Sequence, residues 1–227
     1  PNLLRKYEGL EKLNTNYTNI EKGNHIYDFI ESILNKSNVK FFPESQLIGK
    51  YKKSFLKNSK LQILDIGTGS GCILLSLLKE MPNCYGIGID ISKKSINISK
   101  YNAKMLQLTN KVKFYQSDVD NFKIGKYDLI VSNPPYIEEL SLKYLENDVV
   151  CFEPKLALNG GIDGFSKIRK VIDKATVLIK KNGKLVLEIG FNQKNKVQEM
   201  LRKKGFYINK TLKDYGKKDR CVISTKI

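Results

Sequence analysis

From residue 61 onward, short apolar runs alternate with stretches in which apolar residues recur at helical spacing. The runs that are typical of buried strands are Leu61–Ile66, Cys84–Asp90, Lys111–Gln116 and Tyr127–Val131. The stretches that predict helices with one buried face are Cys72–Lys79, the segment that follows Ser92, and Phe165–Ile179. This alternation predicts an α/β fold with a doubly wound, mainly parallel sheet.

The pattern continues to the carboxyl terminus. Gly183–Gly190 predicts another strand, and Val197–Leu201 predicts a helix that ends near Gly205. Two last apolar runs, Phe206–Ile208 and Cys221–Thr225, predict a hairpin-like finish. We therefore expect a seven-stranded sheet with one antiparallel strand near the C-terminus.

The amino-terminal part has a different pattern. Residues 1–40 are polar and only weakly periodic, and helical spacing returns after Pro43-Glu44-Ser45-Gln46. We expect an appendage over residues 1–40 and one α/β domain over residues 41–227. A chain of 227 residues with 41% hydrophobic content suits one such domain with a real core.

A glycine-rich segment, Gly67-Thr68-Gly69-Ser70-Gly71, joins the first predicted strand to the first predicted helix. Strand, glycine loop and helix form the context of a nucleotide-type cofactor site. The spacing departs from the dinucleotide pattern, and Asp65 precedes the loop, where a carboxylate would repel a pyrophosphate. A carboxylate suits the cationic end of S-adenosylmethionine, which has no phosphate. The alternative for Asp65 is a loop cap.

Two later strand ends carry further candidates for the cofactor. Asp90 ends the second predicted strand, where a carboxylate can accept hydrogen bonds from both ribose hydroxyls. Asp118 and Val119 follow the third predicted strand and are candidates for holding the adenine amino group and covering its ring. An ordinary turn carboxylate is the alternative for Asp118.

The fourth predicted strand ends in Asn133-Pro134-Pro135-Tyr136. Two prolines in a row end a strand, so Asn133 lies at the carboxyl end, where open α/β sheets bind ligands. An Asn amide, a bare backbone carbonyl and an aromatic ring can together hold a planar NH2 group. A plain turn is the alternative, because Asn-Pro and Pro-Pro are turn dipeptides.

The composition excludes several kinds of site. His25 is the only histidine and lies in the polar amino-terminal segment, so multi-His metal sites and His-based triads are nearly excluded. Four scattered cysteines without a C-x-x-C pair indicate reduced thiols in a cytoplasmic setting, with no metal. The organellar matrix is the alternative if a targeting segment has been removed. No apolar run is long enough to span a bilayer, so we expect no membrane partner.

The formal net charge is +17, and residues 192–220 hold ten Lys/Arg against three Asp/Glu, or 10 − 3 = +7. Such a surface could meet nucleic acid. The chain is rich in Lys, Asn and Ile throughout, which points instead to compositional drift. Nucleic acid is therefore not the favoured partner.

The Asp65 to Gly71 segment, Asp90 and Asn133-Pro-Pro-Tyr136 resemble the class I, Rossmann-like methyltransferases that act on planar nitrogens. Within these, the chain resembles the HemK/PrmC-type protein-(glutamine-N5) methyltransferases of peptide-chain release factors, which function in translation termination. Gly161-Ile-Asp-Gly164 and the tail Asp214-Tyr-Gly-Lys-Lys-Asp-Arg220 support the resemblance. Gln46, where the family usually has Glu, and Phe42, where it has Arg, depart from it.

The resemblance implies S-adenosylmethionine as cofactor and class I release factors as protein substrates. It implies that Asn133 and the Pro134 carbonyl accept the two N–H bonds of a glutamine amide, that Tyr136 packs on its plane, and that Pro135 belongs to the same substrate site. Asn133 would also contact the cofactor. Residues 1–40 would be a remnant of a helical substrate-binding domain. The alternatives are adenine-N6 methylation of DNA or RNA, methylation of a ribosomal-protein glutamine, and a cofactor-binding module without turnover.

Overall fold

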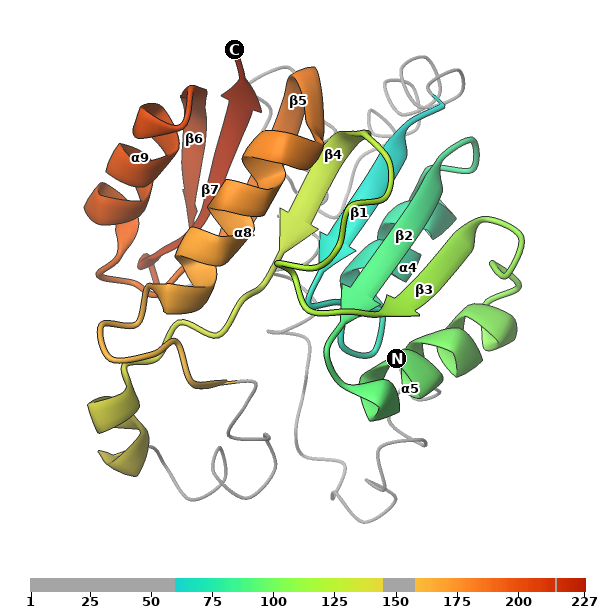
Figure 1. The fold of residues 1–227 in the computed structure, drawn as a ribbon, viewed down its shortest axis with the longest axis horizontal. Helices are drawn as coiled ribbons and strands as arrows, with labels where there is room; N and C mark the ends of the chain where they lie inside the picture. The colour runs from blue at the N-terminus through green and yellow to red at the C-terminus, as the bar shows by residue number, and fades with distance from the viewer. Residues whose placement is uncertain (1–59, 145–157, 215) are drawn as a thin grey trace. The chain divides into compact units, whose positions relative to one another are not determined.

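The structure is a computed structural model that describes residues 60–144, 158–214 and 216–227, in two compact units that divide after Ser117 (Figure 1). The predicted appendage over residues 1–40 and the helical pattern that follows Pro43 lie outside the described residues. Residues 145–157 and residue 215 also lie outside them.

The described part of the first unit, residues 60–117, alternates strands and helices. Its elements are β1 (Gln62–Ile66), α4 (Cys72–Glu80), β2 (Tyr85–Asp90), α5 (Lys93–Met105) and β3 (Val112–Gln116). The strands have the order β3-β2-β1 and both ladders are parallel. Parallel neighbours require crossover connections, and α4 and α5 provide them. Every element predicted from the apolar pattern in this stretch is confirmed.

The helices of the first unit begin and pack as their sequences predict. The Ser92 hydroxyl accepts a hydrogen bond from the Ser95 backbone N–H at 3.2 Å, which caps α5. Ile96 and Ala103 of α5 are buried, whereas Ile98 is only half-buried. The apolar face of α4 joins the β1 and β2 side chains in a core that contains Ile63, Leu64, Leu74, Leu75, Leu77, Leu78 and Ile89.

The second unit also combines strands with helices. Its described elements are β4 (Tyr127–Ser132), the 3-10 helix η1 (Glu139–Tyr144), α8 (Ser166–Leu178), β5 (Ile179–Glu188), α9 (Lys194–Lys203), β6 (Phe206–Lys213) and β7 (Asp219–Lys226). β4 pairs with β5 in parallel, and β7 lies between β5 and β6, antiparallel to both. Figure 1 shows α8 over β4 and β5 and α9 beside β6. The antiparallel strand near the C-terminus is thus confirmed.

All seven strands belong to one mixed sheet, so the predicted fold class, α/β with a mainly parallel seven-stranded sheet, is confirmed. The side chains that fill the core of the second unit come from its strands and from the inner faces of α8 and α9. They are Leu129, Ile130, Val131, Ile168, Ile172, Leu185, Leu187, Val197, Leu201 and Phe206. No helix in the described ranges has the length and apolar character needed to cross a membrane.

One boundary differs from the prediction. β5 begins at Ile179, directly after α8, whereas the apolar pattern places its start at Gly183. The added residues, Lys180 to Asn182, are exposed, and Asn182 has a positive φ of 63°. Exposed strand residues carry no hydrophobic signal, although the ladder between β4 and β5 already pairs Tyr127 with Ile179.

Candidate active site

The loop between β1 and α4 is a rigid turn with one open side. Gly67, Gly69 and Gly71 have φ values of +74°, +55° and +82°, which L side chains rarely adopt. The N–H groups of Gly67 and Thr68 both donate to the Ile89 carbonyl at 2.9 Å, which ties the loop to β2. A Cβ added at Gly67 or Gly69 would meet no atom within 4 Å, so a ligand could approach this backbone.

Asp65, at the end of β1, is a buried carboxylate that is only half satisfied. The Thr68 hydroxyl donates to its Oδ2 at 2.7 Å, whereas its Oδ1 is buried and has no hydrogen-bond partner in the described ranges. Burial raises the pKa of Asp65 to about 7, against the lowering effect of the Thr68 bond. An unsatisfied buried oxygen is costly, and a nearby cation would compensate for it.

Asp90, at the end of β2, holds the glycine loop in place. Its Oδ2 accepts the Gly69 N–H at 2.9 Å and its Oδ1 accepts the Ser92 N–H at 2.8 Å. Each carboxylate oxygen has a second acceptor site, so Asp90 keeps the capacity to accept two hydroxyl groups. Asn102 of α5 is a further support that the sequence pattern missed: its buried amide donates to the Ser70 carbonyl at 2.9 Å.

Asp118 and Val119 begin the second unit. Asp118 Oδ1 accepts the Asp120 N–H at 2.8 Å, and its carbonyl accepts the Asn121 N–H at 3.2 Å. Asp118 therefore does form a turn, the role given above as its alternative. Val119 is half-buried. Contact of these two residues with an adenine stays a prediction.

The segment Asn133-Pro134-Pro135-Tyr136 leaves β4 directly, as predicted. Ser132 is buried at the strand end, Asn133 is exposed and Pro134 is buried. In the described ranges, neither the Asn133 side chain nor the Pro134 carbonyl has a hydrogen-bond partner. Since neither proline has a backbone N–H, the turn presents acceptors without donors from those two residues.

The backbone after Pro135 packs against a glycine-rich loop. The Gly160 N–H donates to the Ile137 carbonyl at 2.8 Å, and the Ile137 N–H donates to the Leu158 carbonyl at 3.1 Å. A Cβ at Gly160 would lie 2.9 Å from both the Cα and the carbonyl carbon of Tyr136, so only glycine fits there. Gly164, the last residue of the motif named above, is equally constrained, because a Cβ there would lie 2.8 Å from the Tyr136 carbonyl oxygen.

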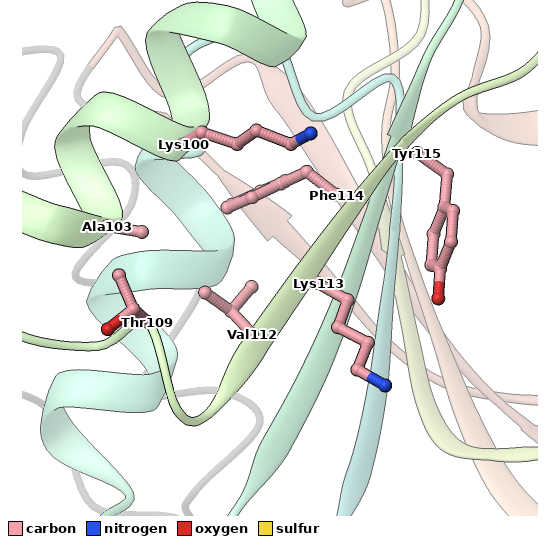
Figure 2. A pocket seen from close by; sticks show the side chains of 7 residues that line it. All are labelled: Lys100, Ala103, Thr109, Val112, Lys113, Phe114 and Tyr115. Atoms are coloured by element: carbon pink, nitrogen blue, oxygen red, sulfur yellow. The ribbon is translucent and has the colours of Figure 1, made fainter.

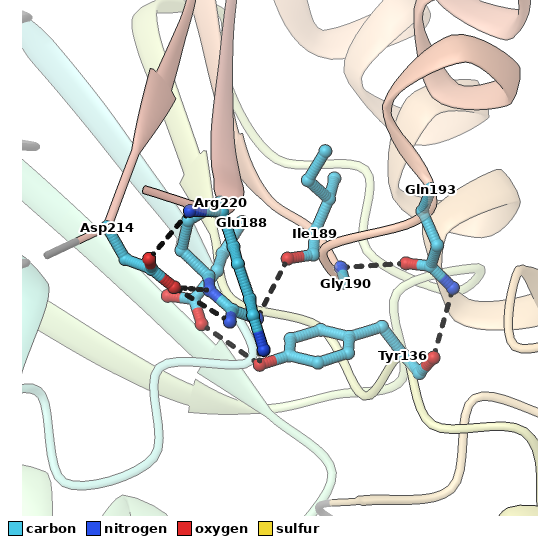
Figure 3. A network of polar contacts seen from close by, with 8 residues as sticks. Tyr136, Glu188, Ile189, Gly190, Gln193, Asp214 and Arg220 are labelled. Atoms are coloured by element: carbon cyan, nitrogen blue, oxygen red, sulfur yellow. Dashed lines mark hydrogen bonds and ion pairs between the residues drawn. The ribbon is translucent and has the colours of Figure 1, made fainter. Parts of the chain in front are cut away.

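Gln193 holds this region together, although no motif in the sequence marks it. Its side chain is buried, with 4% of its surface exposed. Its Nε2 donates to the Tyr136 carbonyl at 3.0 Å, and its Oε1 accepts the Gly190 N–H at 2.9 Å (Figure 3). The same Nε2 also donates to the Gly164 carbonyl at 3.1 Å. One amide thus joins three loops of the second unit.

The Tyr136 ring is held at its far end. Its hydroxyl donates to Glu188 Oε1 at 3.3 Å (Figure 3). Burial, followed by the charge of Glu188, raises the pKa of Tyr136 to about 12, so the hydroxyl remains a neutral donor at physiological pH. Burial also raises the pKa of Glu188. The ring therefore has a fixed orientation beside Asn133 and Pro134 in the chain.

A separate surface pocket of about 360 Å³ lies against α5 and β3 in the first unit (Figure 2). Lys100 and Phe114 line it, and none of the predicted site residues does. It offers no carboxylate for a cationic ligand, so we do not assign it to the candidate site. In the described ranges, no cluster of His, Cys, Asp or Glu is suited to hold a metal ion.

The known proteins that this chain resembles in sequence include several methyltransferases. A family model described as a methyltransferase domain matches residues 57–223. A release factor glutamine methyltransferase of Agrobacterium fabrum is 32% identical over 203 residues, which cover 87% of this chain and 70% of the relative. Those of Caulobacter vibrioides and Rhodospirillum rubrum are each 35% identical over 81% of this chain. The chain spans 64% and 57% of the length of these two relatives.

Solved structures share the fold. A magnesium protoporphyrin IX methyltransferase from Synechocystis PCC 6803, solved with bound SAM, has a TM-score of 0.61 at 16% identity, over 98% of this chain and 89% of its own. A methyltransferase from Pyrococcus furiosus has a TM-score of 0.56 at 19% identity, over 91% of this chain and 98% of its own. At such identities the likeness concerns the arrangement of strands and helices alone.

Proposed function

Because the chain belongs to the release factor glutamine methyltransferases, we propose that it methylates the side-chain amide nitrogen of a glutamine in a class I peptide-chain release factor, with S-adenosylmethionine as methyl donor. The observation that carries the proposal is the turn after β4. There, the Asn133 amide and the Pro134 carbonyl lack partners in the described ranges, and the Tyr136 ring is held beside them in the chain. With such a substrate the protein would function in translation termination.

The first unit fits the proposed cofactor. S-adenosylmethionine supplies an electrophilic methyl group on a sulfonium when it is bound. The unpaired buried oxygen of Asp65 suits the cationic end of this molecule, and the open side of Gly67-Thr68-Gly69-Ser70-Gly71 admits it to the loop backbone. Asp90 keeps acceptor capacity for the ribose hydroxyls. Asp118 and Val119, which begin the second unit, are also proposed at the adenine.

The second unit fits an amide substrate. An amide nitrogen is a weak nucleophile because its lone pair is delocalised, but it is unprotonated at neutral pH and needs no base beforehand. Asn133 and the Pro134 carbonyl would hold its two N–H bonds and stabilise the charge that develops on nitrogen. Tyr136 would pack on the amide plane and exclude water. Glutamate would place a carboxylate oxygen against those acceptors and be rejected.

A transfer assay tests the proposed function. The protein is incubated with methyl-labelled S-adenosylmethionine and, in separate reactions, with a class I release factor, ribosomal proteins, DNA or RNA. We expect label in the release factor, lost when its modified glutamine is replaced by glutamate. Label in nucleic acid alone would establish the adenine alternative, and label in a ribosomal protein alone would move the substrate to that protein. Absence of label in every reaction would leave a cofactor-binding module.

The pKa of Asp65 predicts a pH dependence of cofactor binding. Its folded-state pKa of about 7 lies above the ordinary pKa of 3.8 for Asp, so the free protein loses stability as pH rises between these values, because the buried group must ionise. A cation favours the ionised form. The affinity for S-adenosylmethionine should therefore increase from about pH 6 to about pH 8, by up to about tenfold per pH unit. Isothermal titration calorimetry at several pH values measures this affinity.

The control for this prediction separates Asp65 from the titration of the ligand itself. Asp65→Asn should bind more weakly and show a flatter profile than the wild type. Asp173→Asn changes an exposed carboxylate on α8 and should keep the wild-type profile. If Asp65→Asn retains the full slope, Asp65 is not the group that pairs with the cationic end.

A further inference from the structure

Asp214 and Lys218 of the tail motif lie between β6 and β7, and Arg220, which ends the motif, belongs to β7. The Asp214 N–H donates to the Lys218 carbonyl at 2.8 Å, and Asp214 Oδ1 accepts the Lys218 N–H at 3.0 Å. Asp214 Oδ2 accepts two bonds from Arg220, from Nε at 3.2 Å and from Nη2 at 3.0 Å. The same carboxylate therefore closes the turn and fixes the guanidinium.

This ion pair is better shielded from solvent than a surface pair. The Asp214 side chain is 11% exposed and that of Arg220 is 24% exposed. For comparison, Asp163 and Arg169 make a similar two-bond contact, with 40% and 45% of their side chains exposed. Exposed pairs contribute little, whereas a planar guanidinium held by two bonds in a partly buried site has a defined orientation.

The Nη1 end of the Arg220 guanidinium faces Tyr136 (Figure 3). Its Nη1 lies 3.4 Å from the Tyr136 hydroxyl oxygen, to which it donates, and 3.4 Å from the Ile189 carbonyl. Tyr136 donates in turn to Glu188. The hydroxyl thus has one donor from β7 and one acceptor from β5, which together determine where the end of the ring lies.

We propose that Arg220, held by Asp214, is a positioning residue for the Tyr136 ring: it fixes the face on which the substrate amide packs. The proposal rests on the proposed function, because it assigns a role to the ring in that reaction. It explains why the tail motif pairs an acid with an arginine six residues later. Arg220 acts through the hydroxyl and does not touch the amide.

Kinetics with the release factor as substrate test this role. Arg220→Lys keeps the charge but loses the planar fork that contacts both Asp214 and Tyr136. We expect kcat to fall about ten- to a hundredfold, because the Tyr136 ring would be displaced from the position in which it packs on the amide. KM and the affinity for S-adenosylmethionine should change little. Arg169→Lys makes the same substitution in the exposed pair and should leave kcat unchanged.

A double-mutant cycle separates positioning from a general structural role. Tyr136→Phe removes the hydroxyl and keeps the ring, so adding Arg220→Lys to it should lower kcat no further. Asp214→Asn should behave like Arg220→Lys in both backgrounds, which provides a second variant if Arg220→Lys folds poorly. Equal losses with and without the hydroxyl, or no loss at all, would overturn the proposal. Failure of the proposed function would show differently, since the wild type itself would then not methylate the release factor.

Discussion

Asn133→Ala is expected to lower turnover by about 10²–10³-fold, the usual cost of removing one fixed polar group from a reacting centre. The reason is that the amide oxygen of Asn133, exposed and without a partner in the described ranges, would be one of only two acceptors for the substrate N–H bonds. The affinity for S-adenosylmethionine should stay near the wild-type value. Single-turnover rates with labelled cofactor and release factor measure the first effect, and calorimetry measures the second.

Two variants sharpen this prediction. Asn133→Asp keeps an acceptor oxygen at the same place and should lose less turnover than Asn133→Ala. Asn110→Ala removes an exposed Asn from the turn before β3 and should behave as the wild type does. Near-normal turnover of Asn133→Ala would remove the turn after β4 from the active site.

Gln193→Glu is expected to destabilise the protein by about 3–5 kcal/mol. The substitution replaces the Nε2 group, which donates to the Tyr136 and Gly164 carbonyls, by a buried carboxylate oxygen that repels both. A protonated Glu can still donate one bond, so the loss should become smaller as pH falls toward its raised folded-state pKa. Denaturant unfolding at about pH 7.5 and about pH 5 measures both effects.

The matched control lies on α9. Gln198 donates to the Thr211 hydroxyl at 2.9 Å and accepts from Arg202 at 3.2 Å. Gln198→Glu makes the same chemical change, but the hydroxyl can rotate to donate and Arg202 then faces an opposite charge. Its stability should stay within about 0.5 kcal/mol of the wild type. Similar losses of stability for the two variants would show that the three hydrogen bonds of Gln193 contribute no more to stability than those of Gln198.

The glycine loop and the end of β4 could be predicted from the sequence because their signals are local. Glycine between an apolar strand and an apolar helix, and two prolines after a strand, restrict the backbone whatever the rest of the chain does. The φ values of Gly67 and Gly69 and the abrupt end of β4 after Ser132 agree with those signals.

The supports of the site could not be predicted in the same way. Gln193 contacts Tyr136, which lies 57 residues earlier in the chain, and Arg220 contacts it across 84 residues. A Gln before a polar helix has no periodic or motif signal. Its importance depends on three backbone groups that only the folded chain brings together. The exposed start of β5 could not be predicted for a different reason: ladder hydrogen bonds join backbone groups and do not depend on side-chain type.

The two prolines after Asn133 have a consequence for how often the reaction can occur on one nitrogen. Neither has a backbone N–H, so these two residues offer the amide acceptors and no donor. An unmodified NH2 group has two hydrogens and, bound as proposed, satisfies both acceptors. A methylated nitrogen has one hydrogen left, so one acceptor loses its partner and the product binds more weakly than the substrate. The turn would therefore bind an NH2 group more tightly than a methylated NH group, which favours release of the product after a single methyl transfer.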